Sequence, residues 1–395
     1  MLVTILLSVL LAAASGEEKC EQGSNCKIPD CRCASNNLDY HKISTKDIPQ
    51  FILLTFDDAL NILNNVTYHD IFLSGKKNKK NGCPIAGTFF VTHEYNDYTL
   101  VHEYWRQGNE IASHSISHRP YHDYWKNADE ERLKDEMVDM RFMLAKYALI
   151  EENQITGTRA PFLQTSGDNF FSTLSTNKFK WDSSMPTRTH SGDENVQKMY
   201  PYTLDYGYKQ DCVIPPCPKE QYKGFWVVPM VMQYVSMELE DGSIIEVPCS
   251  MLDACSPQPE TKEDTVTFLK KNFNYHYNSN RAPFPIFLHE TWLKDENRKQ
   301  GYLEFVDWAL TKNDVFIVTI SEMLDYFKDP KPLSSYSQKK CVKTPPSSKC
   351  TSKSFCQYKK EDTPFEGPRI MSTCTPCPEV YPWLKNPNGE RSTFK

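Results

Sequence analysis

Short, continuous apolar runs that alternate with helical stretches constrain the fold of this chain more than any other feature of its sequence. Residues 51–55 form the clearest run, and residues 87–92 have the same character. A strand that is apolar at every position is typical of a parallel sheet with both faces covered. Alternating strands and helices therefore predict an α/β fold, with the sheet open or closed into a barrel. Further strands are expected at residues 224–228, 285–288 and 315–319.

The clearest helix is expected over residues 127–149. Apolar residues recur there at spacings of four and three, which places them on one face of a helix. They are Leu133, Met137, Met140, Leu144 and Tyr147. Asn127 followed by Glu130 is typical of a helix N-terminus. We interpret the apolar stripe as core packing and expect a second helix after Ser321.

The composition of the chain changes along its length and divides it into segments. Residues 1–16 are an apolar run followed by small residues, which predicts a secretory signal peptide. Residues 17–48 are polar and are expected to be a Cys-rich leader packed on the main domain at 49–328. From residue 329 to 395, Pro, Ser, Lys and Cys predict a disulfide-pinned tail without periodic structure.

Fourteen cysteines agree with secretion, because disulfides persist in the extracellular space. We expect up to seven disulfides, and the sequence leaves their pairing open. The C-x-x-C spacing of Cys374 and Cys377 offers a zinc cluster as an alternative, but a second such pair is missing. Residues 186–223 and 230–262 are expected to be Cys-pinned loop insertions. Asn65 lies in a glycosylation sequon, which predicts a surface loop.

The charge of the chain argues against a nucleic-acid partner. The net charge is -6, from 45 basic and 51 acidic residues, and no basic block stands out. The apolar run at residues 2–11 is shorter than the ~20 residues that a membrane span needs. We therefore predict a secreted protein without a membrane span, acting as a monomer.

Two neighbouring aspartates, Asp57 and Asp58, follow the first predicted strand. A carboxylate at the end of a buried strand must be paired or coordinated, and the C-terminal strand ends carry the active sites of parallel α/β folds. Adjacent strand residues point to opposite sides, so one aspartate can bind a metal while the other takes a proton. The structural alternative is that an aspartate here caps the next helix or turn.

His114 and His118 are four residues apart, which puts both imidazoles on one face of a helix or helical turn. Two histidines and one aspartate make a three-ligand metal site with open positions for water or substrate. Taken alone, such a histidine pair also occurs by chance.

Three more polar residues lie in turns or at strand ends. Arg159 could hold a catalytic carboxylate charged through a bidentate contact, although a single arginine is by default a surface residue. His289 follows an apolar strand and could protonate a leaving amine; the alternative is a core histidine. Asp182 is a candidate partner that would orient this histidine.

Together these motifs resemble the polysaccharide deacetylase family, that is, carbohydrate esterase family 4 with its NodB-homology domain. The matching segments, in order, are 55–58, 114–118, 159–162, 181–184 and 288–289. The fourth matches least well, because Trp181 precedes the aspartate. Residues 109–118 and 249–255 are also similar to insect chitin deacetylases, in particular the short, gut-associated ones, since a chitin-binding module is not evident.

The resemblance implies a distorted (β/α) barrel that removes N-acetyl groups from chitin with a metal-bound water. By position, Asp58, His114 and His118 would hold the metal, expected to be zinc with cobalt as a substitute. The implied catalytic roles are Asp57 as general base, Arg159 as its orienting partner, His289 as general acid, Asp182 as tuner of His289, and the backbone N–H of Phe162 as oxyanion donor.

A sugar polymer would stack on exposed rings. The candidates are Trp292, which lies just after His289, Trp181 and Trp226, with Trp105 and Trp125 as further rings. The expected location is extracellular, in a chitinous matrix such as the gut peritrophic matrix. Alternative functions are a catalytically weak chitin-binding matrix protein and a deacetylase of another acetylated glycan, such as acetyl xylan.

Overall fold

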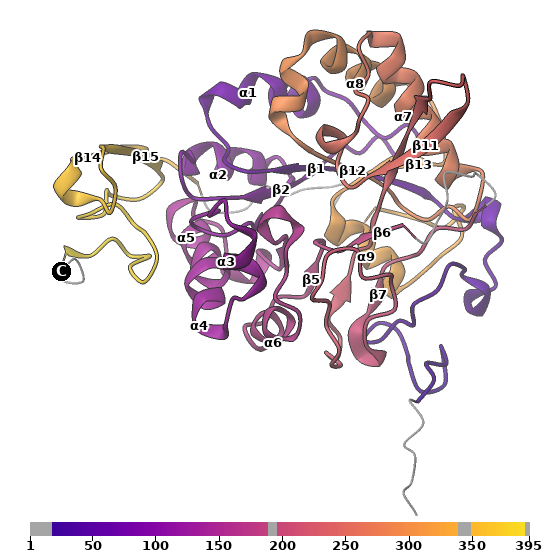
Figure 1. Ribbon diagram of the computed structural model, residues 1–395, viewed down its shortest axis with the longest axis horizontal. Coiled ribbons are helices and arrows are strands. Elements are labelled where there is room, and N and C mark those ends of the chain that lie inside the picture. Colours follow the sequence, from indigo (N-terminus) through magenta and orange to yellow (C-terminus); the bar gives the residue numbers. More distant parts are fainter. Residues whose placement is uncertain (1–17, 189–195, 339–348, 392–395) are drawn as a thin grey trace, which may run out of the picture.

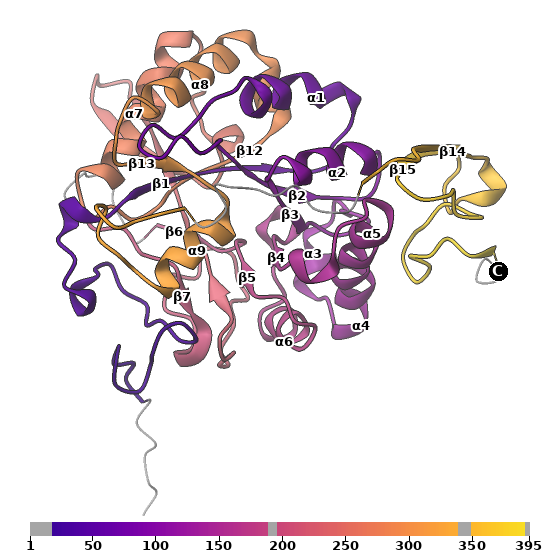
Figure 2. The same ribbon diagram turned by 180° about the vertical axis from the view of Figure 1, so that it is seen from behind.

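The computed structural model describes residues 18–188, 196–338 and 349–391 (Figures 1 and 2). The predicted signal peptide and the last four residues of the tail lie outside this part of the chain. Within it, no helix combines the length and the apolar character that crossing a membrane would require.

A nine-stranded sheet forms the centre of the molecule, in the order β12-β1-β2-β3-β4-β5-β8-β7, with β13 also paired to β1. Its strands are β1 (Gln50–Asp57), β2 (Thr88–Val91), β3 (Glu110–Ser113), β4 (Gly157–Thr158), β5 (Trp181–Asp182), β7 (Tyr202–Thr203), β8 (Trp226–Val227), β12 (Phe284–His289) and β13 (Val315–Ile317). Except for the antiparallel pair β7–β8, neighbouring strands run parallel. The sheet curls into a half-barrel, which confirms the predicted fold class.

The apolar run in β1 is continuous because both faces of the strand are buried. Ile52 and Leu54 pack into one hydrophobic cluster, whereas Phe51 and Leu53 point the other way into a second cluster. Successive strand residues alternate between faces, so a strand covered on both sides has to be apolar throughout. The strands expected from the other runs are present as β2, β8, β12 and β13.

Helices cover the sheet, with α7 and α8 side by side at one end and α2 to α5 grouped at another (Figures 1 and 2). The helices are α1 (Ile62–Tyr68), α2 (Tyr98–Arg106), α3 (His122–Lys126), α4 (Glu130–Leu133), α5 (Asp139–Tyr147), α6 (Asp168–Thr176), α7 (Lys262–Tyr277), α8 (Glu296–Ala309) and α9 (Ile320–Lys328). α9 corresponds to the helix expected after Ser321.

The helix expected over residues 127–149 is divided in the structure. α4 and α5 are joined by a π-helical turn at Lys134–Val138, and the N-cap is Asp129, whose side chain accepts a hydrogen bond from the Arg132 N–H, rather than Asn127. The predicted apolar stripe is buried. The division matters because π-turns often mark functional positions, and Glu136 lies in this one.

Two hairpins occupy segments for which no regular structure was expected. β10 (Gln233–Glu238) and β11 (Ile244–Cys249) pair antiparallel within the predicted loop insertion. β14 (Ser354–Tyr358) and β15 (Arg369–Thr373) pair antiparallel within the predicted irregular tail. A short parallel pair, β6 (Pro186–Thr187) with β9 (Met230–Val231), ties the two insertions together.

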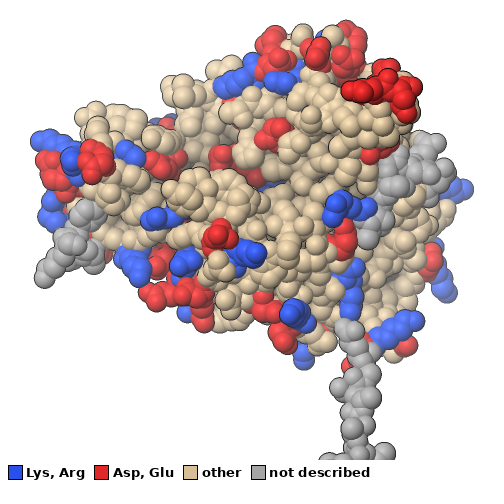
Figure 3. Space-filling view, in the orientation of Figure 1, with Lys and Arg blue, Asp and Glu red and all other residues tan. Residues whose placement is uncertain are grey.

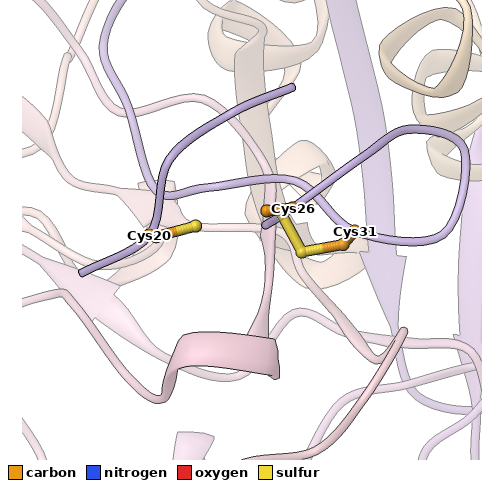
Figure 4. A group of neighbouring side chains, drawn as sticks. All are labelled: Cys20, Cys26 and Cys31. Carbon is orange, nitrogen blue, oxygen red and sulfur yellow. A yellow bond between two sulfur atoms is a disulfide. The ribbon is translucent and has the colours of Figure 1, made fainter. Parts of the chain in front are cut away.

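Disulfides pin the leader, the loops and the tail, as expected. The bonded pairs with both cysteines among the described residues include Cys20–Cys33, Cys26–Cys31, Cys212–Cys217, Cys249–Cys255, Cys350–Cys374 and Cys356–Cys377. The last two pairs use both cysteines of the C-x-x-C motif, which excludes a zinc cluster there. Cys20, Cys26 and Cys31 also lie close together, but Figure 4 shows the Cys26–Cys31 bond, and Cys20 is bonded to Cys33, so these sulfurs are not thiolate ligands.

The predicted sequon lies in helix α1 rather than in a surface loop. The Asn65 Oδ1 accepts a hydrogen bond of 2.8 Å from the Tyr104 hydroxyl. Thr67 is buried and donates a hydrogen bond to Glu290. On the face shown in Figure 3, the described Lys and Arg side chains are interspersed with Asp and Glu rather than gathered into one basic patch.

Candidate functional site

The carboxyl ends of the parallel strands bring the predicted site residues together. In the register of β1 and β12, Asp57 lies opposite His289. His114 directly follows β3, and Arg159 directly follows β4. The segments that are scattered along the sequence therefore meet at one edge of the sheet.

Asp57 and Arg159 form a buried ion pair at the floor of the site. The Arg159 Nη1 donates to the Asp57 Oδ1 at 2.5 Å, and the two side chains are 0% and 2% exposed. The guanidinium also donates from Nε to the Ser183 carbonyl at 2.7 Å, and it lies 3.8 Å from the centre of the Phe90 ring. These contacts hold the Arg159 guanidinium in place, and the guanidinium in turn fixes the orientation of the Asp57 carboxylate. The alternative interpretation of Arg159 as a surface residue is wrong, because its side chain is 0% exposed.

The charges around Asp57 favour its ionised form. Burial raises the pKa of this carboxyl, but Arg159, His114 and His289 act against it together with the hydrogen bond from Arg159, and the pKa stays below its ordinary value. Asp57 is therefore an anion whose charge is balanced by its neighbours.

Asp58, His114 and His118 form the group that could hold a metal. Their ligand atoms all lie within 4.8 Å of one another. Ligands bound about 2.0–2.2 Å from zinc are separated by at most about 4.4 Å, so small side-chain movements would close this set on an ion. The residues present fit a divalent metal.

His114 has the hydrogen bonding that a metal ligand needs. Its Nδ1–H donates to the Arg159 carbonyl at 2.7 Å, which leaves the Nε2 lone pair facing the site. Burial lowers the pKa of His114 to about 4, despite the opposing charge of Asp57. The imidazole is thus neutral, as coordination requires.

The histidine segment is a loop, not the helix or helical turn that the four-residue spacing indicated. Residues 114–118 have no helical assignment, and Ser115 and His118 have φ values of 77° and 41°. The imidazole centres nevertheless lie 5.0 Å apart. The left-handed kinks, rather than helical periodicity, bring the two rings to one side.

Glu136 holds this loop in place, and sequence reasoning missed it. Its carboxylate accepts hydrogen bonds from the backbone N–H of Ile116 (3.2 Å) and of Ser117 (2.9 Å), and from the Ser117 and Tyr124 hydroxyls. The side chain is fully buried in the π-turn between α4 and α5. The helical pattern of the sequence carried no sign of this turn.

His289 is paired with Asp253, not with Asp182. The His289 Nδ1 is hydrogen-bonded to the Asp253 Oδ2, and its Nε2 lies 3.8 Å from the Asp58 Oδ2. Burial lowers the pKa of His289, but Asp253, Asp57 and Asp58 outweigh it and raise the pKa to about 9. The alternative of a neutral core histidine is wrong, because the side chain is 30% exposed and surrounded by carboxylates.

Asp182 supports the strand end that carries Arg159. Its Oδ2 accepts hydrogen bonds from the hydroxyls of Thr158 (2.9 Å) and Ser184 (2.7 Å). The Ser184 Oγ in turn accepts from the Ala160 N–H at 2.8 Å. These hydroxyls engage the buried carboxylate, and the hydrogen bond to His289 that was expected of Asp182 is made by Asp253 instead. Sequence reasoning missed Asp253. The one feature that could have indicated it is its position between Cys249 and Cys255, whose disulfide anchors the loop.

Phe162 borders the metal group from the side of η6 (Pro161–Leu163). It has a φ of 55°, and its ring lies 4.9 Å from that of His118 and 5.1 Å from that of His122. This left-handed conformation turns the backbone sharply directly after Pro161, beside the proposed ligands.

The tryptophans expected to contact substrate are buried. Trp181, Trp226 and Trp292 are 1%, 3% and 4% exposed, so their ring faces are not open for stacking. The Trp292 Nε1 donates to the Gln258 Oε1 at 2.6 Å. Trp105 and Trp125 are buried as well. Proximity of Trp292 to His289 in sequence did not reveal that its ring packs inward.

A curled, mostly parallel sheet carries an Asp–His–His group and a buried Asp–Arg pair at its carboxyl edge, an arrangement that suits hydrolysis by a metal-bound water. The sequence model of the family described as Polysaccharide deacetylase matches residues 45–170. The chain is 38% identical to Chitin deacetylase 8 of Bombyx mori over 98% of its own length and 99% of that protein. It is 32% identical to Chitin deacetylase 1 of Bombyx mori, over 93% of this chain and 68% of that protein.

Among solved structures, a protein of Mycobacterium smegmatis described as a polysaccharide deacetylase is similar, with a TM-score of 0.43 and 16% identity over 71% of this chain and 90% of that chain. On the sequence comparisons, the chain belongs to the polysaccharide deacetylase family, and it is similar to the insect chitin deacetylases within it.

Proposed function

We propose that this protein is a secreted, metal-dependent deacetylase that removes N-acetyl groups from chitin. One observation carries the proposal: a buried, arginine-held carboxylate lies beside an open Asp–His–His group, with a carboxylate-paired histidine opposite. The likeness to chitin deacetylases over nearly the whole chain supports chitin as the substrate. We assign catalysis to residues 49–328, and the disulfides agree with an extracellular location.

Asp58, His114 and His118 would hold the metal, and two imidazoles with one carboxylate suit zinc, with cobalt as a substitute. Such an ion lowers the pKa of water to about 7 and polarises a carbonyl. The amide carbonyl of the substrate would lie between this group and the backbone N–H of Phe162, which would donate to the developing oxyanion.

Asp57 would act as general base. Its Oδ1 is fixed by Arg159, while its Oδ2 lies 3.8 Å from the His114 Nε2 and so faces the metal group. One oxygen is therefore held and the other is placed to take a proton from the attacking water. A base positioned in this way contributes roughly 10²–10⁴-fold to the rate.

His289 would act as general acid. Asp253 holds its Nδ1, so the Nε2–H points toward Asp58 and the site. An amide expels its amine only after the nitrogen is protonated, and the Nε2–H would supply that proton. Base and acid thus approach the reacting carbon from Asp57 and from His289 respectively.

The test is acetate release from N-acetylglucosamine oligomers by the purified protein, with and without a chelator, followed by reloading with zinc or cobalt. We expect release that the chelator abolishes and either metal restores. Metal-loaded protein that releases no acetate, while a related deacetylase does so in parallel, would refute the proposal.

Two comparisons separate the alternatives. Initial rates on chitin oligomers, peptidoglycan fragments and acetyl xylan rank the acetylated substrates, and we expect chitin oligomers to be fastest. A matrix protein that only binds chitin would instead show negligible turnover, with an Asp57→Asn variant that still binds chitin in a pull-down.

A further inference from the structure

The Cys-rich tail is part of the main body of the molecule. The buried tail residues Tyr358, Met371 and Tyr381 belong to the same hydrophobic cluster as Tyr98 and Tyr147. Figures 1 and 2 both show β15 beside α2, and the backbones of Ser372 and Asp97 form an isolated parallel β-bridge. The position of the tail relative to the metal group is thus fixed by packing.

Polar contacts fix the tail further. The Cys374 N–H donates to the Tyr147 carbonyl at 2.8 Å, and the Cys350 N–H donates to the His102 Nε2 at 3.0 Å. The Arg369 guanidinium contacts the Glu94 carboxylate at 2.8 Å. The tail is therefore held at several points along the same side of the body.

A cleft of about 300 Å³ lies between the tail and the extension of the histidine loop. Ser117, Arg119 and Tyr121 line one wall, and Phe365 and Trp383 line the other, with Glu94 between them. Ser117 and Arg119 flank His118 in sequence, so the loop that carries this proposed ligand also borders the cleft. Its size is at the lower end of the range for ligand sites, roughly 300–1,000 Å³.

The rings of the cleft are held in place but remain accessible. Tyr121 is 65% exposed. Phe365 and Trp383 are half-buried, with ring centres 4.7 Å apart, and the Arg369 guanidinium lies 3.7 Å from the Phe365 ring. Tyr121 thus offers the open aromatic face that the buried tryptophans do not provide, and the partly exposed Phe365 and Trp383 line the same cleft.

The polar groups of the cleft favour a neutral polymer rich in hydroxyl groups. Glu94 is paired with Arg369, so together with Arg119 these groups leave one net positive charge, and guanidinium and carboxylate groups can donate to and accept from hydroxyls. A single net charge gives little attraction for a highly charged polymer. A pyranose presents an apolar face to rings and hydroxyls at its edge, which matches this combination.

We propose that this cleft is a binding subsite for sugar units of the same glycan chain whose acetylated unit lies at the metal group, and that the tail supplies one wall of it. The inference rests on the proposed function for the identity of the glycan. Recognition would thus extend from Asp58 past the histidine loop to the tail, and long chains would gain binding that short ones do not.

The experiment compares Tyr121→Ala and Phe365→Ala with Phe355→Ala as matched control, because Phe355 is a tail ring that is 60% exposed and lies outside the cleft. For each protein, kcat/KM is measured on a hexamer and on a dimer of N-acetylglucosamine. We expect the hexamer-to-dimer ratio to fall about tenfold in both cleft variants, the scale of a lost aromatic contact, and to keep its value in Phe355→Ala. An unchanged ratio in both cleft variants would overturn the subsite.

Binding separates this inference from the proposed function. Each substitution is also placed in the Asp57→Asn background, and hexamer affinity is measured by calorimetry, which needs no turnover. If the unaltered protein has no activity but the cleft variants still lose about tenfold in hexamer affinity, the subsite holds and the deacetylase proposal fails. If turnover is normal and affinity does not change, the subsite fails alone.

Discussion

The floor and the rim of the site are built in different ways, although neighbouring residues supply them. On the floor, Asp57 and Arg159 are buried, paired at 2.5 Å and positioned by strand ends. On the rim, the side chain of Asp58 is 47% exposed and lies 3.7 Å from His118 and 3.8 Å from His289. The rim is held by loops, through Glu136 on one side and the Cys249–Cys255 loop on the other.

This difference shows how the buried charge of Asp57 can lie next to the open metal-binding group of Asp58, His114 and His118. The sheet fixes the floor, where an unpaired charge would be costly. The loops leave the rim open to an ion and a substrate, while second contacts define its geometry. Removing the arginine from the floor pair should therefore affect stability first, whereas changes on the rim should affect metal binding and rate.

The largest effect on stability is expected from Arg159→Leu. It leaves Asp57 buried without its partner, which should lower the free energy of unfolding by about 3–5 kcal/mol. Urea unfolding measures the change. The control is Lys385→Met, which breaks an ion pair with Glu131 whose side chains are 68% and 75% exposed and should leave stability unaltered. Equal, small changes in both variants would show that the floor pair is not structural.

On the rim, Asp253→Asn should lower kcat/KM by about 10–100-fold, because His289 loses the anion that orients it. The metal content and the free energy of unfolding should stay as in the unaltered protein. Asp241→Asn, in the exposed turn between β10 and β11, serves as the control. A full rate in Asp253→Asn would remove Asp253 from the account of His289.

Glu136→Gln tests how the histidine loop is held. Glutamine replaces one of the two acceptor oxygens by an NH2 group, so two of the four hydrogen bonds that Glu136 accepts are lost, and metal affinity should fall about 10–100-fold. Competition with a chromophoric chelator measures it. Glu130→Gln, at the start of α4 and 62% exposed, should keep the full affinity. If both variants bind metal equally well, the loop does not depend on Glu136.

The smallest effect concerns His93, which joins the body to the tail. Its Nε2 contacts the Pro382 carbonyl at 2.9 Å, and burial lowers the pKa of His93 to about 3 despite that hydrogen bond. The unfolded chain takes up a proton near pH 6.5 that the folded protein excludes. Stability should therefore fall as the pH drops below about 6.5, by about 1.4 kcal/mol per pH unit.

The variant His93→Gln keeps a donor to Pro382 and cannot titrate. Unfolding at pH 7 and pH 5 should show a larger loss for the unaltered protein than for this variant. An equal loss in both proteins would contradict the link between the buried imidazole and the stability of the fold.

The parts that could be predicted from the sequence are those with a local signature. Residues 51–55 revealed β1 because burial on two faces demands a continuous apolar run. Asp57, His114 and Arg159 could be placed because the carboxyl ends of parallel strands converge. The β10–β11 hairpin was missed because its buried residues, which include residues 233–235, lie together at one end while Ile244 and Ile245 are exposed, so its pattern does not alternate.

The missed site residues depend on contacts that sequence spacing does not encode. Asp253 lies 36 positions from His289, and Glu136 is placed by a π-turn inside a helical pattern. The prediction that tryptophans contact the substrate was wrong, because the burial of a ring follows from packing rather than from its position near a motif. The open rings of the cleft come in part from the tail, whose docking the sequence did not reveal.

The central claim is that neighbouring aspartates have separate tasks, Asp58 for the metal and Asp57 for the proton. The most direct test measures metal content and acetate release in Asp57→Asn and Asp58→Ala side by side. We predict that Asp57→Asn keeps its metal but loses roughly 10²–10⁴-fold in rate, and that Asp58→Ala loses both metal and activity. Full metal content in Asp58→Ala, or full activity in Asp57→Asn, would contradict the account.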